Sequence, residues 1–266
     1  MKQYQEKIIK ILEKKGQEFL NKPYKEIDFF KDDKKTEKEI KNRANKLLNN
    51  LKIYPHAFVL ACIMDSMINA EEAWLIPYKV SKQINGFGFV KLSKLGKKEI
   101  KQIFKKEKVP RFWKRKAEYF YNAIQKIKKD YDSDASKIWK DNPTSCVVVK
   151  RFLEFDGVGR KIATMATNIL YRNFKIKMKD NHCIDVSPDR QVKRVFERTG
   201  FIPKNASDDE LMYCTRELGP EYPGIFDLPV WEIGRKYCHP KNPECIKCYL
   251  NNYCPKILSD CSRPKT

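Results

Sequence analysis

The sequence predicts an all-α protein, and three observations support this fold class. Only 10 of the 266 residues are glycine. No pattern of repeated short strands occurs, and many stretches are rich in Lys, Glu, Leu, Ile and Ala, which favour helices over sheets. Apolar residues make up 41% of the chain, which is enough for a real core in two modest domains or one large one.

The first predicted helices follow the apolar pattern of the N-terminal half. The highly charged segment from Met1 to about Leu51 reads as helical, with a loop around Asp28–Lys35. Ala57–Met64 (AFVLACIM) lacks a polar face, which predicts a core helix buried on all sides. We expect two further helices, around Lys97–Lys106 and Trp113–Lys129, separated by turn signals.

The second half continues as helices joined by short turns. A helix over Val147–Phe155 ends at a Gly-x-Gly turn, and the next helix starts at once, because apolar residues then recur at i, i+3, i+4, i+7 and i+8. Another helix is expected to open at Ser187-Pro188-Asp189, with Ser187 as its N-cap and Pro188 as its first residue. The last predicted helix runs from Pro229 to about Tyr237.

The charge of the chain indicates a polyanionic partner. Lys and Arg number 55 against 34 Asp and Glu, a formal charge of +21, which favours nucleic-acid binding by counterion release and steering. A thermophilic or AT-rich source would raise Lys and Glu together, but Glu does not keep pace here. The longest apolar run, Ala57–Met64, is too short to span a bilayer, so we expect a cytoplasmic, nucleoid-associated protein without a membrane anchor.

The cysteines indicate a metal centre. Nine cysteines without a signal sequence point to metal ligands and buried thiols rather than disulfides. Four of them lie within seventeen residues and can surround one tetrahedral metal or one cubane cluster, so the spacing leaves zinc and [4Fe–4S] open. These four, the cysteine tetrad, are Cys238, Cys245, Cys248 and Cys254. The others have no such spacing and are predicted to be ordinary thiols: Cys62, Cys146, Cys183, Cys214 and Cys261.

The Gly-x-Gly turn is a candidate phosphate-binding hairpin. In Gly157-Val158-Gly159 the glycines permit a tight turn, and its N–H groups and the following helix N-terminus would suit a DNA phosphate. Taken alone, such a turn between helices is more often simply a connection. Arg160 and Lys161 follow it directly.

The hairpin comes before the tetrad, and between them lies the segment Asp189-Arg-Gln-Val-Lys-Arg-Val. In this order, these elements resemble those of the endonuclease III-like helix-hairpin-helix (HhH-GPD) DNA glycosylases. The resemblance extends over roughly Tyr54 to Cys254. It implies a six-helix barrel domain over 54–173, which contains the hairpin, and a discontinuous helical domain over 1–53 and 174–266. It also implies that the loop 238–254 holds a [4Fe–4S] cluster, rather than zinc.

The resemblance implies that Lys161 is the nucleophile and Asp189 the catalytic carboxylate, with Asp185 in reserve. An amine can attack the sugar C1′, release the base and leave a Schiff base from which β-elimination follows. A carboxylate can stabilise the oxocarbenium-like sugar and move protons. Without the resemblance, Lys161 would be an exposed or phosphate-contacting lysine, and Asp189 a charge at a helix N-terminus.

Further residues are expected to bind DNA or the extruded base. The candidate DNA-binding residues are Gly157, Val158, Gly159, Arg160, Arg235, Lys241 and Lys247. Asp65 and Asn69 are candidates for a base pocket, or else the exposed end of a core helix. Ile68 or Asn69 stands where the family carries a glutamine wedge, so base expulsion must differ here. Met64 stands where adenine-excising relatives carry a glutamate; those relatives also lack the lysine, which excludes that subfamily.

We therefore expect a monomeric base-excision-repair DNA glycosylase with AP lyase activity, acting on duplex DNA with a damaged or mispaired base or an abasic site. Two alternatives stay open. One is an abasic-site lyase with little base excision. The other is a non-catalytic iron–sulfur DNA-binding protein. The sequence does not reveal which base is removed.

Overall fold

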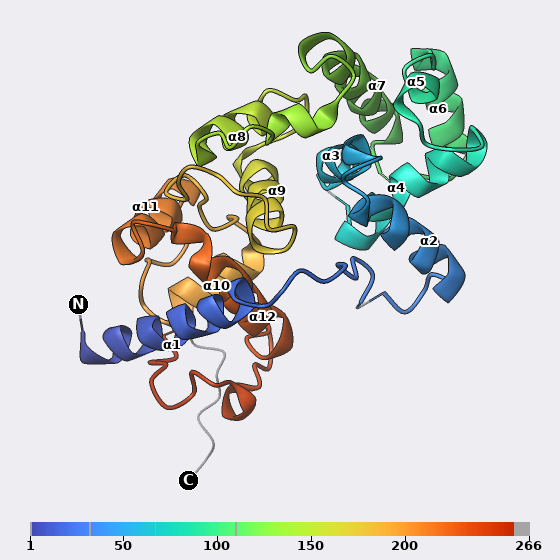
Figure 1. Ribbon diagram of the computed structural model, residues 1–266. Coiled ribbons are helices and arrows are strands. Elements are labelled where there is room, and N and C mark those ends of the chain that lie inside the picture. Colours follow the sequence, from blue (N-terminus) through green and yellow to red (C-terminus); the bar gives the residue numbers. More distant parts are fainter. Residues whose placement is uncertain (1, 32, 67, 110, 258–266) are drawn as a thin grey trace. The chain divides into compact units, whose positions relative to one another are not determined.

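The computed structural model describes residues 2–31, 33–66, 68–109 and 111–257, and within these ranges it contains helices and turns and no strand. The predicted all-α class is confirmed. The chain divides into two compact units by its internal contacts (Figure 1). Unit 1 comprises Met1–Tyr24, Thr144–Val149 and Thr167–Thr266, and unit 2 comprises Lys25–Pro143 and Lys150–Ala166.

Unit 2 is built around α3. All ten residues of α3 are buried, because none of its faces is polar, and Pro55 suits its first turn. It packs against α2, α4 and α7, and α6 lies beside α7. The helices of unit 2 are α2 (Lys38–Asn49), α3 (Pro55–Met64), α4 (Ala70–Gln83), α5 (Phe89–Leu92), α6 (Lys97–Lys106), α7 (Trp113–Asp130) and η1 (Ala135–Ile138). The prediction of a fully buried helix over Ala57–Met64 is confirmed.

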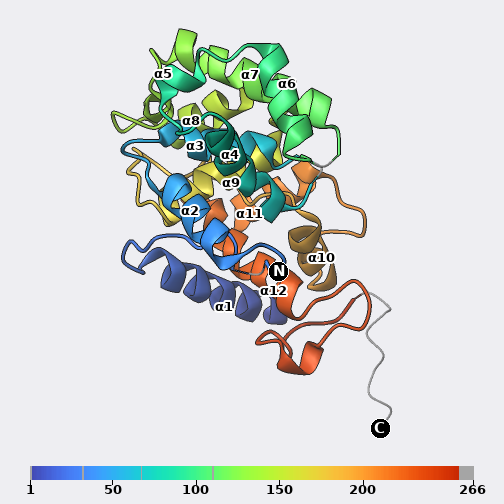
Figure 2. The ribbon, with the colours of Figure 1, turned by 90° about the vertical axis from the view of Figure 1, so that its right-hand side faces the viewer.

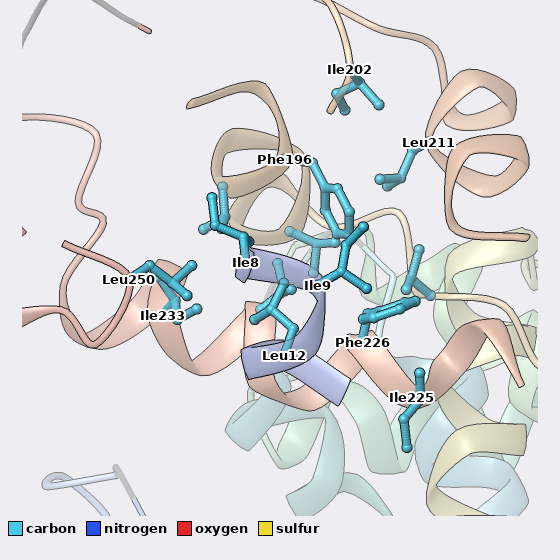
Figure 3. Packing of buried hydrophobic residues seen from close by; sticks show 14 of the residues in the cluster. Ile8, Ile9, Leu12, Phe196, Ile202, Leu211, Ile225, Phe226, Ile233 and Leu250 are labelled. Atoms are coloured by element: carbon cyan, nitrogen blue, oxygen red, sulfur yellow. The ribbon is translucent and has the colours of Figure 1, made fainter. Parts of the chain in front are cut away.

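Unit 1 has its own core, to which the N-terminal helix contributes. Ile8, Ile9 and Leu12 of α1 lie among apolar side chains of the C-terminal helices (Figure 3). Helix α1 contacts η2 and α12, and both ribbon views place α12 beside it (Figure 2). The other helices that lie wholly in unit 1 are α10 (Arg190–Arg198), α11 (Asp208–Leu218), η2 (Pro223–Phe226), α12 (Asp227–Lys236) and η3 (Cys245–Lys247), and α1 spans Gln3–Leu20.

Two helices are shared between the units. Helix α8 (Ser145–Leu153) passes from unit 1 to unit 2 after Val149, and α9 (Arg160–Arg172) returns to unit 1 after Ala166. The division by contacts also differs from the predicted boundary at Tyr54. Residues 25–53 belong to unit 2, because α2 packs against α3 and α4.

Helix α10 begins two residues later than expected, so Ser187 is not its N-cap. The N-cap is Asp189, whose side chain accepts a hydrogen bond from the Gln191 backbone N–H at 2.7 Å. Ser187 is buried outside the helix, and its own N–H donates to Asp227 Oδ1 at 2.7 Å. Among the described residues, no helix has the length and apolar character needed to cross a membrane.

Candidate active site and metal centres

The predicted hairpin connects α8 to α9 and depends on a glycine that no other residue can replace without strain. Gly157 has φ +80°, and a Cβ there would lie 2.4 Å from Cδ2 of Tyr119. At Gly159 a Cβ would meet nothing within 4 Å. The Gly159 carbonyl accepts the N–H groups of Ile162 and Ala163 at 3.1 and 3.0 Å, which starts α9 directly after the turn.

Asp156, an acidic residue beside the expected phosphate site, is held by a neighbouring helix. Its Oδ2 accepts a hydrogen bond from Nδ2 of Asn122 at 2.7 Å. Asn122 and Tyr119 both belong to α7, so α7 contacts the hairpin through both side chains. The carboxylate is thereby paired within unit 2 instead of being left beside the turn without a partner.

Lys161 and Asp65 lie close together in unit 2. Lys161 is the second residue of α9, and its Nζ lies 3.9 Å from Oδ2 of Asp65, the residue that follows α3. The Lys161 side chain is 43% exposed, whereas that of Asp65 is 4% exposed. The lysine can therefore meet a substrate from solvent while its carboxylate partner stays mostly shielded from water.

A buried lysine, Lys116 of α7, completes the surroundings of Asp65. Its Nζ donates to the carbonyl oxygens of Met64 and Ser66, at 2.8 and 2.6 Å, and so binds the C-terminal end of α3. Burial lowers the pKa of Lys116 to about 8, against an opposing effect of the Asp65 charge. No motif of the sequence indicates a role for Lys116, although it lies on the same helical face as the buried Phe120.

The remaining candidate carboxylate and pocket residues lie at helix ends or in ion pairs. Asp189, of unit 1, caps α10. Asp185, the reserve candidate, is buried and accepts two hydrogen bonds from Arg216, at 2.7 and 2.8 Å. Asn69 is the exposed N-cap residue of α4, without a side-chain cap bond. Met67, between the candidate pocket residues, lies outside the described residues.

The cysteine tetrad lines one cavity of unit 1 with apolar residues of α10 and α12. Burial raises the pKa of Cys248 to about 11 and raises that of Cys254 as well, so these two thiols need a bound cation to be ionised at neutral pH. Four cysteines around one cavity are a ligand set that suits either a tetrahedral zinc ion or a cubane cluster.

Two arginines of α10 fasten the loop that carries the tetrad. Arg194 donates to the Cys238 carbonyl at 2.6 Å and to the Gly234 carbonyl at 2.9 Å. Arg198 donates to the His239 carbonyl at 2.7 Å and to the Cys238 sulfur at 3.3 Å. Sequence analysis did not assign these arginines a role, because their partners lie about 40 residues further along the chain.

The predicted DNA-binding residues of the tetrad region have different surroundings. The Arg235 guanidinium lies over the ring of Trp231, 4.8 Å from its centroid. Lys241 is exposed, whereas Lys247 forms an ion pair with Glu244 at 2.5 Å. A phosphate would therefore have to compete with Glu244 for Lys247.

One pair of cysteines differs from its prediction. Cys146 and Cys183, expected to be ordinary thiols, form a disulfide with their Cα atoms 4.9 Å apart. Together with His182 they form a group that could bind a metal ion. Cys62 is buried and Cys214 is half-buried, and neither is bonded to another cysteine, whereas Cys261 lies outside the described residues. The prediction failed for this pair because 37 residues separate the two cysteines.

Comparison with known proteins gives a partial match in sequence and a fuller match in fold. No protein-family model matches the chain. Over 107 residues the chain is 31% identical to Endonuclease III of Thermotoga maritima, a match that covers 40% of this chain and 45% of that protein, less than half of its length.

Solved structures match over more of the chain. A trapped endonuclease III–DNA covalent intermediate in an estranged-adenine complex has a TM-score of 0.56 at 16% identity, over 83% of this chain and 96% of its own. A thermostable thymine-DNA glycosylase has a TM-score of 0.61, also at 16% identity, over 95% of this chain and 97% of its own. The helical architecture, the hairpin and these matches agree, and the chain has an endonuclease III-like fold.

Proposed function

We propose that this chain is a base-excision DNA glycosylase with AP lyase activity, in which Lys161 is the nucleophile. The observation that carries the proposal is the pairing of Lys161 with the shielded carboxylate of Asp65, 3.9 Å away, at the exit of the hairpin. The fold supports it, because a structure of the same fold is a trapped covalent endonuclease III–DNA intermediate.

In the proposed reaction the unprotonated amine of Lys161 attacks C1′ of the sugar. The bond from C1′ to the base breaks, and the base leaves with the electron pair and takes up a proton. Loss of the ring oxygen from C1′ leaves a Schiff base, and removal of a C2′ proton then expels the 3′ phosphate by β-elimination. Each step requires a group that can accept or return a proton near Lys161.

We assign proton transfer at Lys161 to Asp65, in addition to the predicted role of Asp189. Asp65 is the carboxylate that unit 2 holds beside the amine, and its low exposure strengthens electrostatic interaction with the oxocarbenium-like sugar. Lys116 fastens the end of α3 that carries Asp65 and is in this proposal a positioning residue. Asp189 keeps its proposed role as the second carboxylate.

The proposed partner is duplex DNA that contains a damaged or mispaired base or an abasic site. The charge of +21 supplies long-range attraction. We propose that the N–H groups of the hairpin and the N-terminus of α9 receive a backbone phosphate, together with Arg160. Arg235, Lys241 and Lys247 would contact phosphates from the tetrad region.

We further propose that the cysteine tetrad holds a [4Fe–4S] cluster. Its four cysteines line one cavity, and Arg198 donates to the sulfur of one of them, Cys238. Such a cluster can transfer electrons and brings a compact charged group that fixes the loop around it. The proposed glycosylase chemistry takes place at Lys161 and uses no redox step.

Borohydride trapping tests the nucleophile. Duplexes that carry an abasic site, uracil, a T:G mispair, 8-oxoguanine or an oxidised pyrimidine are incubated with the full-length chain and reduced. We expect a covalent protein–DNA adduct on at least the abasic duplex, and its loss in Lys161→Gln. The matched control is Lys150→Gln, which removes one exposed lysine of α8 and should retain the adduct.

A second comparison tests the carboxylates. Asp65→Asn keeps the side-chain volume and should lower the single-turnover rate of adduct formation by about 100-fold, the order expected for a general acid–base group. DNA binding should change far less. Asp189→Asn tests the other carboxylate in the same assay, with the melting temperature as the control for the loss of the α10 cap.

The trapping panel also separates the alternatives. Adducts on the abasic duplex alone would indicate an abasic-site lyase with little base excision, which the altered wedge segment around Ile68 and Asn69 favours. DNA binding that persists without any adduct, strand cleavage or released base on every duplex would refute the proposed enzyme. It would leave a non-catalytic iron–sulfur DNA-binding protein.

A further inference from the structure

A second group of metal-ligating side chains lies in unit 1, separate from the cysteine tetrad. It joins Cys146, near the start of α8, to His182 and Cys183 in the loop that precedes Asp189. The two sulfurs and one imidazole nitrogen all lie within 4.8 Å of one another. His182 Nε2 lies 3.6 Å from the Cys146 sulfur.

A hydrogen-bonded network orients the imidazole toward the sulfurs. Asp180 Oδ1 lies 3.2 Å from His182 Nδ1, which favours the tautomer with its proton on Nδ1 and the lone pair of Nε2 directed at the cysteines. The same carboxylate accepts hydrogen bonds from the N–H and the hydroxyl of Ser145, a fully buried residue. The Ser145 hydroxyl oxygen in turn accepts the Cys183 N–H at 3.1 Å.

This arrangement contains more than a disulfide requires. A disulfide needs the two cysteines at a suitable separation, and their Cα distance of 4.9 Å satisfies it. It has no use for an imidazole whose acceptor nitrogen faces the sulfurs, nor for a carboxylate that fixes the ring. Zinc sites with three protein ligands use such groups: two thiolates and one imidazole bind the metal, and a carboxylate holds the second nitrogen of the imidazole ring.

We propose that Cys146, Cys183 and His182 bind one zinc ion when the two cysteines are reduced, with a water molecule as the fourth ligand. The disulfide is the oxidised form of the same site. A phosphine reductant supplies two electrons, takes up one oxygen atom from water and leaves two thiols. Zinc then replaces the two thiol protons, which are released to solvent.

The test is a zinc titration of the full-length, iron-loaded chain under anaerobic conditions, with a phosphine reductant and a chromophoric chelator as competitor. We expect one zinc per chain in the reduced protein and none at this site after oxidation with diamide. Cys146→Ser and Cys183→Ser should each abolish this binding and leave the iron content unchanged. Cys214→Ser, at a half-buried cysteine outside the group, is the matched control and should bind zinc normally.

Milder substitutions make the result independent of folding defects. His182 is largely exposed, so His182→Asn should fold normally and yet lose zinc affinity. Asp180→Asn should weaken zinc binding by about 10- to 100-fold, the usual effect of losing the carboxylate behind a ligating histidine. Cobalt in place of zinc should give a thiolate charge-transfer band that Cys146→Ser removes.

The proposal is overturned if the reduced protein binds no zinc against a micromolar competitor, or if zinc binding survives Cys146→Ser. It is also overturned if all bound zinc is lost on changing the tetrad alone. None of these outcomes bears on Lys161, so the test is independent of the proposed function.

Discussion

The two glycines of the hairpin should respond very differently to the same substitution. In Gly157→Ala the new Cβ must accept φ +80° and an approach of 2.4 Å to the Tyr119 ring. The left-handed conformation costs about 1–2 kcal/mol. Overpacking costs about 1–3 kcal/mol. The free energy of unfolding should therefore fall by about 2–5 kcal/mol in total.

Gly159→Ala should leave the fold intact. The new methyl group meets nothing within 4 Å. Alanine makes the unfolded chain less flexible, which raises the free energy of unfolding by about 0.4–1 kcal/mol. Alanine is also a poorer N-cap residue than glycine, which lowers it. The net change in the free energy of unfolding should therefore stay within about 1 kcal/mol. If a DNA phosphate approaches the turn as proposed, Gly159→Ala should still weaken DNA binding.

Urea unfolding of the two variants and salt-dependent DNA binding measure both effects. Tyr119→Ala in the Gly157→Ala background should recover the part of the loss that comes from the ring contact, and leave the part that comes from the backbone conformation. The reasoning fails if Gly157→Ala unfolds within about 0.5 kcal/mol of the wild type, the usual range of neutral surface changes. Equal destabilisation by the two substitutions would refute it as well.

Three further results should follow from the structure. Burial lowers the pKa of His56 to about 4, so the folded state keeps it neutral while the unfolded chain takes up a proton below pH 6.5. Stability should fall by up to about 3 kcal/mol between pH 6.5 and 4, and His56→Asn should remove this dependence in acid-titrated unfolding. Arg216→Met leaves the buried Asp185 carboxylate without its two hydrogen bonds and should cost about 3 kcal/mol in urea unfolding, much of it recovered in the Asp185→Asn/Arg216→Met double variant. Cys245→Ser should abolish bound iron and its visible absorbance, whereas Cys214→Ser should retain both; iron retained in Cys245→Ser would exclude this tetrad as the cluster site.

Features that depend on short stretches of sequence could be predicted. The buried helix α3 follows from an apolar run without a polar face, and the hairpin follows from two glycines between apolar patterns. Local patterns predict these features because their stabilising contacts recur within a few residues. The Ser187 N-cap was wrong because Asp189, two residues further along, caps the helix with its own side chain.

Features set by contacts between distant segments escaped prediction. Nothing in the spacing of Cys146 and Cys183 indicates their meeting, and Lys116 is one lysine among many until Met64 and Ser66 become its partners. The proximity of Asp65 to Lys161 likewise depends on how α3 and α9 pack within unit 2. The sequence indicates both residues as candidates, but not their pairing.

Helix α10 connects the cysteine tetrad to the proposed catalytic carboxylate Asp189. Asp189 caps this helix at its N-terminus, and Arg194 and Arg198 of the same helix hold the backbone on either side of Cys238. A cluster that fixes this loop would therefore fix α10 and, with it, the position of Asp189. Loss of the cluster should then lower activity without any redox step, and it should do so by loosening α10. The role that we propose for the tetrad is accordingly to position a carboxylate, while the proposed bond breaking takes place at Lys161 and its neighbouring carboxylates.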